Sequence, residues 1–512
     1  MKTPALFLLL IATAAHAEVK LPALISDNMV LQQDLPANVW GWAEAGEKVS
    51  VKFGEKSAEA TADAKGRWAV KLAELPSGAT GEMTVAATNT LTIKNVAVGE
   101  VWVCSGQSNM EFTVRGAMNA TEEISGADFP LLRHFTVGRA AKGEPQEDCT
   151  GKWEVCAPQT VAGFTAAGYF FGRQLHQNLK VPVGLIHSSW GGTAAELWTP
   201  WPVLSGDPDF KSITAGWQKT VDEYPAARAK YDDDMAVWRE AEKKAKDAGE
   251  PAPAQPRAPR GGDIVGSPSS LYNGMIAPLL PYTIRGVTWY QGESNAGNAT
   301  LYRKLFPTMI ESWRTAWREP DSAFLFVQLA NYMQRHDEPT DTNWARLREA
   351  QTMALQLPHT GMALAIDVGD AADIHPKDKQ TVGKRLALAA EATVYYRDVE
   401  YSGPMFGGAQ MEGEKVRLTF RNGEGMKPAE GEKVKGFAIA GEDRKFVWAD
   451  AEIAGDHVII SSPEVKAPAS VRYAWADNPE CNLINAAGLP ASPFRTDDWP
   501  AGPAPVKAPA KP

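Results

Sequence analysis

Cysteine is scarce in this chain, with four residues in 512, and no two of them lie in a Cys-x-x-Cys spacing. The eight histidines include no His-x-x-x-His pair. Zinc sites in proteins are usually built on pairs of these kinds. The sequence therefore predicts no metal site.

Long hydrophobic runs are also missing. The apolar run Ala5–Ala14 is too short to span a bilayer, and no later run reaches the length of a membrane helix. Lys2 precedes this run and the sequence Ala15-His16-Ala17 follows it, which is the pattern of a cleavable signal peptide over residues 1–17. Cys104 is the first cysteine, so no lipid-anchoring cysteine follows the signal. We expect a secreted or periplasmic protein that has no membrane partner.

Positive charge is not in excess, because 52 basic and 62 acidic residues give a formal net charge of −10. Cleavage of the signal segment removes Lys2 and no acid, which makes the charge −11. Nucleic acids and anionic membrane surfaces reward clustered positive charge, so this balance argues against both as partners. It is compatible with a neutral sugar and gives no help in attracting an acidic one. The sequence does not specify the oligomeric state.

The four cysteines differ in whether we expect them to form a disulfide bond. Cys149 and Cys156 flank six residues, a span short enough for a disulfide-closed loop in an oxidising compartment, and we expect them to be bonded. Cys104 lies in an apolar, strand-like run and is expected to be a buried free thiol. Cys481 has no evident partner.

Short alternating segments with turn residues fill both ends of the chain, whereas apolar strand-like runs alternate with helical ones in the middle. The middle predicts an α/β domain with a mostly parallel sheet, in which we expect a helix at 162–179 and strands at 183–188, 286–290, 324–329 and 362–367. The predicted organisation is a signal peptide (1–17), an N-terminal β-sandwich (18–95), the α/β domain (96–399) with a charged helical insertion (about 205–262), a C-terminal β-rich domain (400–498) and a disordered tail (499–512).

Ser108 lies in the most informative stretch of the chain, Val101–Met110. This stretch begins as an apolar strand and breaks at Ser105-Gly106, so the chain turns and presents Ser108 at the strand's carboxyl end. Ligands and catalytic groups collect at that edge of open α/β sheets. A serine hydroxyl becomes a good nucleophile only when a base takes its proton. The sequence must therefore also supply a histidine.

A histidine is offered by the motif Asp370–Pro376, which contains His375. Asp373 precedes His375 by two positions and is placed to hold the imidazole in the tautomer that a general base needs. The motif follows a strand-like run, as the Ser108 motif does. We therefore expect Ser108 and His375 to meet at one edge of the sheet.

Two further motifs after strand-like runs offer hydrogen-bond donors. The first contains Gly191 and Gly192, and consecutive glycines allow backbone N–H groups to approach a ligand closely, as an oxyanion hole requires. The second is Trp289–Asn295, in which the side-chain amide of Gln291 can donate to a developing oxyanion.

Together these motifs resemble those of the sialate O-acetylesterases, a carbohydrate esterase family of the SGNH hydrolase superfamily. The resemblance covers nearly all of the chain after the signal segment and rests on SDNMVLQQ (Ser26–Gln33), GQSNM (Gly106–Met110), SSWGGT (Ser188–Thr193), WYQGESNA (Trp289–Ala296), DIHP (Asp373–Pro376) and the stretch Arg472–Asp497. It implies a flavodoxin-like, three-layer catalytic domain. It also implies a serine esterase that needs no cofactor and removes O-acetyl groups from glycans, above all from 9-O-acetylated sialic acids.

The same resemblance assigns roles to individual residues. Ser108 is the nucleophile, His375 the general base and Asp373 the carboxylate that orients it. The oxyanion donors are the backbone N–H of Ser108 together with Gly192 and Gln291. Gly191, Glu293 and Asn295 stand in the same motifs, and we expect them to support the site.

Two departures from related patterns keep alternatives open. The nucleophile lies in G-Q-S-N and not in the G-x-S-x-G elbow of the α/β-hydrolases, so that fold is the weaker choice. Many SGNH relatives also place the aspartate three positions before the histidine, where this chain has Ala372. Glu293, Asp370 or no carboxylate at all are therefore alternatives to Asp373.

Alternatives to the function also remain. An esterase for acetylated plant polysaccharide such as xylan belongs to the same chemical class, and the sequence does not separate the two. A carbohydrate-binding protein with an inactive central domain is the non-enzymatic alternative. It does not require the Ser108, His375 and oxyanion motifs, all of which are intact.

Overall fold

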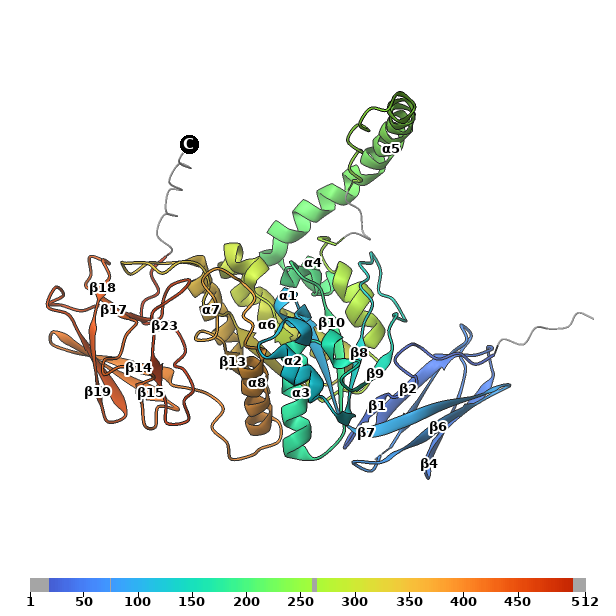
Figure 1. Cartoon of the computed structure of the whole chain (residues 1–512), viewed down its shortest axis with the longest axis horizontal. Helices are drawn as coiled ribbons and strands as arrows, with labels where there is room; N and C mark the ends of the chain where they lie inside the picture. The colour runs from blue at the N-terminus through green and yellow to red at the C-terminus, as the bar shows by residue number, and fades with distance from the viewer. Residues whose placement is uncertain (1–17, 74, 260–264, 501–512) are drawn as a thin grey trace, which may run out of the picture.

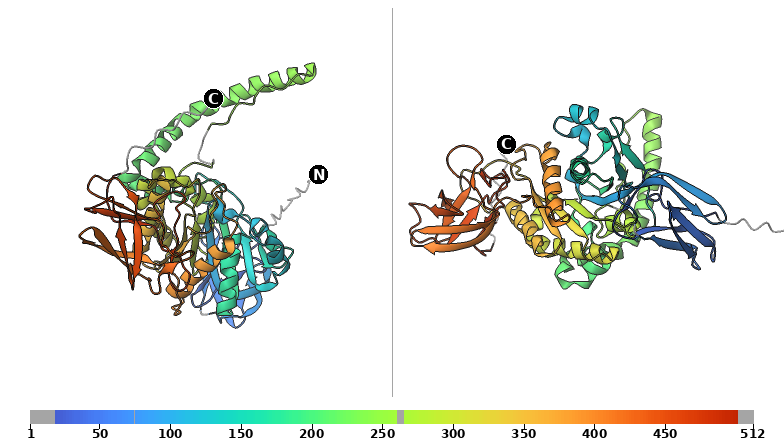
Figure 2. Two further views of the ribbon diagram at one scale, coloured as in Figure 1. Left: turned by 60° about the vertical axis from the view of Figure 1, so that its left-hand side comes forward. Right: turned by 90° about the horizontal axis from the view of Figure 1, so that it is seen from below.

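The computed structural model describes residues 18–73, 75–259 and 265–500. The predicted signal peptide and residues 501–512 of the predicted tail lie outside these ranges. A central α/β body carries one β-rich unit at each end, and a single long helix, α5, projects from the body (Figure 1). Figure 2 shows the same projection of α5 from a second direction.

The central sheet is mostly parallel. Its strands follow the order β13-β12-β11-β7-β10-β8-β9, and every neighbouring pair is parallel except β8–β9. The strands are β7 (Thr90–Gly106), β8 (Phe129–Thr136), β9 (Trp153–Cys156), β10 (Val183–Ser189), β11 (Gly286–Tyr290), β12 (Ala323–Gln328) and β13 (Thr360–Leu364). The predicted α/β fold with a parallel sheet is confirmed.

Helices cover both faces of this sheet. Successive side chains of a strand point to opposite faces, so the apolar strands leave two faces to be buried. On β7, Trp102 and Cys104 join a buried cluster with residues of α3 and α8. Val101 and Val103 join a second cluster with residues of α6 and α7. The described helices are α1 (Ser108–Glu111), α2 (Ala120–Ser125), α3 (Ala166–Leu179), α4 (Trp201–Gly206), α5 (Lys211–Ala248), α6 (Ala299–Trp317), α7 (Asn343–Met353) and α8 (Lys379–Thr393).

Helix α3 begins at Ala166, four residues later than the hydrophobic pattern predicts. Thr165 caps it, since its side chain accepts a hydrogen bond from the backbone N–H of Gly168. The three residues Val161–Gly163 form a separate 3-10 turn before the cap.

The N-terminal β unit shares a strand with the central sheet. It contains β1 (Val30–Gln32), β2 (Ala37–Trp42), β3 (Lys48–Phe53), β4 (Lys56–Thr61), β5 (Arg67–Leu72) and β6 (Thr80–Ala86). β1 and β6 pair with the first part of β7, and the last part of β7 pairs with β10 and β11. The sequence-based boundary at residues 95 and 96 therefore falls inside one continuous strand.

The C-terminal β unit consists of short strands in three small sheets. They are β14 (Met405–Glu412), β15 (Lys415–Arg421), β16 (Lys427–Pro428), β17 (Phe437–Ala440), β18 (Val447–Trp448), β19 (Asp450–Ala454), β20 (His457–Ser461), β21 (Ser470–Tyr473), β22 (Leu483–Ile484) and β23 (Phe494–Arg495). None of the helices in the described ranges is long and apolar enough to cross a membrane.

The expected disulfide between Cys149 and Cys156 is not present, and all four cysteines are free thiols. Cys156 ends β9 and belongs to the core on the α3 side of the sheet, whereas Cys149 packs against the core on the other side. Burial raises the pKa of both thiols to about 12, so neither is in the reactive thiolate form near neutral pH. The short separation in sequence was misleading because the chain crosses between two faces of the sheet.

Candidate active site

The turn after β7 presents Ser108. Gly106 has φ +140°, and a Cβ at this position would lie 2.2 Å from the carbonyl oxygen of Tyr290, so only glycine fits. The chain then leaves the sheet, and Ser108 becomes the first residue of the single-turn helix α1. It is the one residue between Val101 and Met110 that is not fully buried.

Ser108, His375 and Asp373 come together at the carboxyl edge of the sheet. His375 Nε2 lies 2.9 Å from Ser108 Oγ, across a sequence separation of 267 residues. His375 Nδ1 lies 3.2 Å from Asp373 Oδ1, and the backbone N–H of His375 donates to the same oxygen at 2.9 Å. In the tautomer with a proton on Nδ1, Nε2 is free to accept the proton of the serine hydroxyl.

Asp373 is suited to holding that tautomer because it stays ionised. The hydrogen bond from the backbone N–H of His375 has the largest effect and helps to hold the pKa of the Asp373 carboxyl below its usual value. The side chains of Asp373 and His375 are 45% and 33% exposed, so water screens their attraction. The Asp373–His375 pair therefore acts mainly by orienting the imidazole, and less by stabilising a positive charge on it.

The two alternative carboxylates have other partners. Asp370 accepts a hydrogen bond from the backbone N–H of Ala372 at 2.8 Å, within its own loop. Glu293 accepts from the side chain of Asn109 at 2.6 Å, and no hydrogen bond joins it to His375 in the described structure. Of the three carboxylates, Asp373 is the one in contact with the imidazole.

The loop that contains Gly191 and Gly192 lies against Ser108. A Cβ on Gly191 would lie 3.2 Å from Ser108 Cβ and 2.8 Å from Glu111 Oε2. The backbone N–H of Gly191 already donates to that Glu111 oxygen at 2.8 Å. Gly192 has φ +72°, and its N–H has no acceptor within the described ranges. Gly192 and Ser108 thus offer backbone N–H groups, whereas Gly191 supports the loop.

Gln291 is placed differently from the prediction that its amide serves an oxyanion. Its side chain is fully buried, and Nε2 donates to the carbonyl of Thr193 at 3.2 Å and to Asn295 Oδ1 at 2.7 Å. Its Oε1 accepts from the hydroxyl of Tyr302 at 3.0 Å. Both amide protons are therefore used inside the protein. Gln291 and Asn295 brace the loop that carries Gly192.

A buried polar network lies behind Ser108 and His375. Asn109, the residue after Ser108, donates to Glu293 and to the carbonyl of Ile374, which directly precedes His375. The amide oxygen of Asn109 accepts from Lys379 Nζ at 2.6 Å. The side-chain amide of Asn109 thus links the turn that contains Ser108 to the loop that contains His375. Such ties fix the relative positions of catalytic groups.

Burial shifts the pKa values of two groups in this network. It lowers the pKa of Lys379 to about 7 and raises the pKa of Glu293. The Lys379 ammonium lies 5.0 Å from the ring centres of both Phe112 and Tyr290, which compensates in part for the loss of water.

Sequence reasoning missed Asn109, Glu111 and Lys379. Asn109 and Glu111 stand within three positions of Ser108, so their proximity in sequence was the available indication. Lys379 follows His375 by four positions, but a lysine at the start of a helix carries no indication of burial. Within the described ranges no group of three or more His, Cys, Asp or Glu side chains could hold a metal ion.

Comparison with known proteins shows similarity along nearly the whole chain. A family model described as carbohydrate esterase, sialic acid-specific acetylesterase, matches residues 260–392. The chain is 30% identical to the sialate O-acetylesterase of Mus musculus, over 94% of this chain and 95% of the mouse protein. It is 29% identical to the sialate O-acetylesterase of Homo sapiens, over 92% of this chain and 91% of the human protein. A solved carbohydrate acetylesterase, XAC1771 from Xanthomonas citri, is 37% identical and superposes with a TM-score of 0.80, over 94% of this chain and 100% of that one.

Proposed function

Because this chain belongs to the sialate O-acetylesterase family and is a carboxylic ester hydrolase, we propose that it removes acetyl groups from the hydroxyls of sialic acids, 9-O-acetylated ones first, with Ser108 as the nucleophile. The observation that carries the proposal is the 2.9 Å contact between Ser108 Oγ and His375 Nε2. A serine hydroxyl and an imidazole in this geometry form the reactive pair of serine esterases.

The first half of the reaction transfers the acetyl group to the enzyme. His375 Nε2 takes the proton of Ser108 as Oγ attacks the acetyl carbonyl carbon. The N–H groups of Ser108 and Gly192 donate to the oxygen that becomes negative. The tetrahedral intermediate collapses, His375 returns the proton to the sugar oxygen, and the deacetylated sugar leaves.

Water completes the second half. His375 takes a proton from a water molecule, whose oxygen attacks the acetyl carbonyl of the acyl-serine. Collapse of the second tetrahedral intermediate breaks the bond to Ser108, which regains its proton from His375. Acetate is released, and Asp373 keeps the imidazole in the same tautomer through both halves.

Substrate assays test this function. We expect the protein to release acetate from p-nitrophenyl acetate and, with a higher kcat/KM, from 9-O-acetylated sialosides. Acetylated xylo-oligosaccharides serve as the matched carbohydrate control. A kcat/KM on acetylated xylo-oligosaccharides that exceeds the value on the sialosides would refute the proposed substrate and leave the esterase chemistry in place.

A second candidate substrate is another O-acetylated carbohydrate. It is favoured by the likeness to the Xanthomonas citri enzyme, which is described as a carbohydrate acetylesterase and is more similar in sequence than the mammalian relatives. The same panel of acetylated sugars decides between the two.

We also propose that the protein is exported from the cytoplasm. The sequence of residues 2–17, with its basic start, apolar centre and Ala-x-Ala end, supports this proposal. We expect the protein to be recovered outside the cytoplasm with an intact mass that corresponds to a chain beginning at Glu18. Recovery of the full-length chain from the cytoplasm alone would contradict the proposal.

A further inference from the structure

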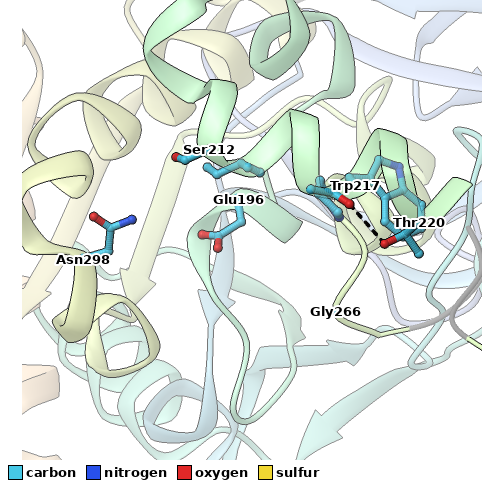
Figure 3. Close-up of a pocket in the computed structure, with 9 residues that line it drawn as sticks. Glu196, Ser212, Trp217, Thr220, Gly266 and Asn298 are labelled. Atoms are coloured by element: carbon cyan, nitrogen blue, oxygen red, sulfur yellow. Dashed lines mark hydrogen bonds between the residues drawn. The ribbon is translucent and has the colours of Figure 1, made fainter.

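A cavity of about 390 Å³ opens between the start of α5 and the segments that support the active site. One face of α5 lines it, through residues spaced along the first three turns of the helix. The opposite wall carries Glu196 and Asn298 (Figure 3). The volume is in the range of cavities that bind small organic ligands. No step of the proposed reaction uses this cavity.

Two short stretches of chain lead from the cavity wall to residues beside Ser108. Glu196 lies five residues after Gly191, where an added Cβ would lie 3.2 Å from Ser108 Cβ. Asn298 ends the 3-10 segment that begins at Glu293, which contacts Asn109 beside the nucleophile. A 3-10 segment rises about 2 Å per residue, so the path from Glu293 to Asn298 is about 10 Å long.

The lining has the chemistry of a sugar site. The Trp217 side chain is half-buried in the wall, and indole rings stack on the apolar faces of sugar rings. The exposed side chains of Asn298 and Ser212 make no hydrogen bond within the described residues, so their polar groups are accessible from the cavity. Figure 3 shows Asn298, Glu196 and Ser212 toward one end of the cavity and Trp217 with Thr220 toward the other.

The charge of the lining selects the kind of sugar. Glu196 is the one ionisable group among the nine lining residues, and none of them is basic. Asn295 Nδ2 donates to one oxygen of its carboxylate at 2.9 Å and holds it in place. A carboxylate accepts hydrogen bonds from sugar hydroxyls and repels the carboxylate of a sialic acid.

We propose that this cavity binds a neutral sugar residue of the glycan that carries the acetylated sialic acid, with Trp217 as the stacking platform and Glu196 and Asn298 as partners of its hydroxyls. This inference rests on the proposed function, since it names the part of the substrate beyond the acetylated residue. The cavity would give the enzyme a preference for sialosides linked to neutral sugars over the free acetylated monosaccharide.

Two variants alter the cavity in opposite ways. Trp217→Ala removes the stacking surface. Gly216→Leu fills the cavity from the same helix, and a Cβ at Gly216 meets no atom within 4 Å, so the helix tolerates the side chain. Trp238→Ala is the matched control, because Trp238 is a half-buried tryptophan further along α5 whose indole donates to the carbonyl of Pro253.

The test measures kcat and KM on three substrates: p-nitrophenyl acetate, a free O-acetylated sialic acid, and the same acetylated sialic acid linked to a neutral oligosaccharide. For the linked substrate we expect Trp217→Ala and Gly216→Leu to raise KM about tenfold at unchanged kcat. The values for the two smaller substrates stay at those of the wild type, and Trp238→Ala changes none of them. Melting temperatures of all variants are measured to verify that each is folded.

Several outcomes overturn the proposal. An unchanged KM for the linked substrate in both cavity variants shows that no sugar binds there. An equal rise for the free and the linked sialic acid shows that the cavity holds the acetylated residue itself.

Failure of the proposed function gives a separate result. In that case the wild type cleaves p-nitrophenyl acetate but neither sialoside. Saturation-transfer NMR with the neutral oligosaccharide alone, on wild type and Trp217→Ala, then decides whether the cavity binds sugar.

Discussion

Replacement of Ser108 by alanine is expected to lower kcat/KM for p-nitrophenyl acetate and for acetylated sialosides by about 10³-fold or more. In the proposed mechanism the oxygen of this hydroxyl forms the bond to the acetyl group of the acyl-enzyme. The Ser108 hydroxyl has His375 as its hydrogen-bond partner, so its removal costs only about 0.5–1.5 kcal/mol of stability. Steady-state kinetics and a thermal melt of the same preparation measure both effects.

His375→Ala provides the companion measurement, because nucleophile and base act as a unit. Loss of either one removes most of the benefit of the other, so the double variant should be about as slow as the slower single variant. A Ser108→Ala enzyme within about tenfold of the wild-type rate would refute the assignment of the nucleophile. A double variant much slower than either single one would show that the two residues act independently.

Asp373→Asn is expected to lower kcat by about 10²–10⁴-fold with little change in KM. Asparagine keeps the shape of the side chain, but its amide no longer favours the Nδ1-protonated tautomer of His375. The substrate does not bind to this carboxylate in the proposed mechanism, which is why KM stays constant. Kinetics on p-nitrophenyl acetate and on a sialoside separate the two parameters.

Glu293→Gln is the matched control for Asp373→Asn. It removes one carboxylate charge near the same histidine and keeps an oxygen that can accept from Asn109. We expect it to cost less than about tenfold in kcat. The reverse order of effects, with a small loss for Asp373→Asn and a large one for Glu293→Gln, would remove Asp373 from the triad.

The sequence predicted those parts of the site that depend on where strands end. Ser108 and His375 are far apart in the chain, yet each follows a parallel strand, and parallel strands end at one edge of the sheet. The fold class followed from the same alternation of apolar strands and helices. Patterns of this kind are local, so a single sequence contains them.

The hydrogen bonds of individual side chains could not be predicted in this way. Gln291 stands in the expected place, but Tyr302, Thr193 and Asn295 occupy its amide. Lys379 is buried beside the active site because helix α8 packs there, and a lysine in a helix is more often exposed. These features depend on contacts between distant segments, which spacing and composition do not encode.

The start of α5 is a second example of a feature that depends on contacts between distant segments. Gly216 and Trp217 lie in a polar, charged helix that reads as a solvated insertion. Only the packing of that helix against Glu196 and Asn298 turns them into the wall of a cavity.

The most direct test of the central claim is chemical labelling of the nucleophile. A phosphonate ester that reacts with activated serines forms a stable adduct resembling the tetrahedral intermediate, and peptide mass spectrometry locates it. We predict complete inactivation of the wild type with one adduct, on the peptide that contains Ser108, and much slower labelling in His375→Ala. An adduct on a different residue, or full activity after exposure to the reagent, would contradict the assignment of Ser108 and His375 as the catalytic pair.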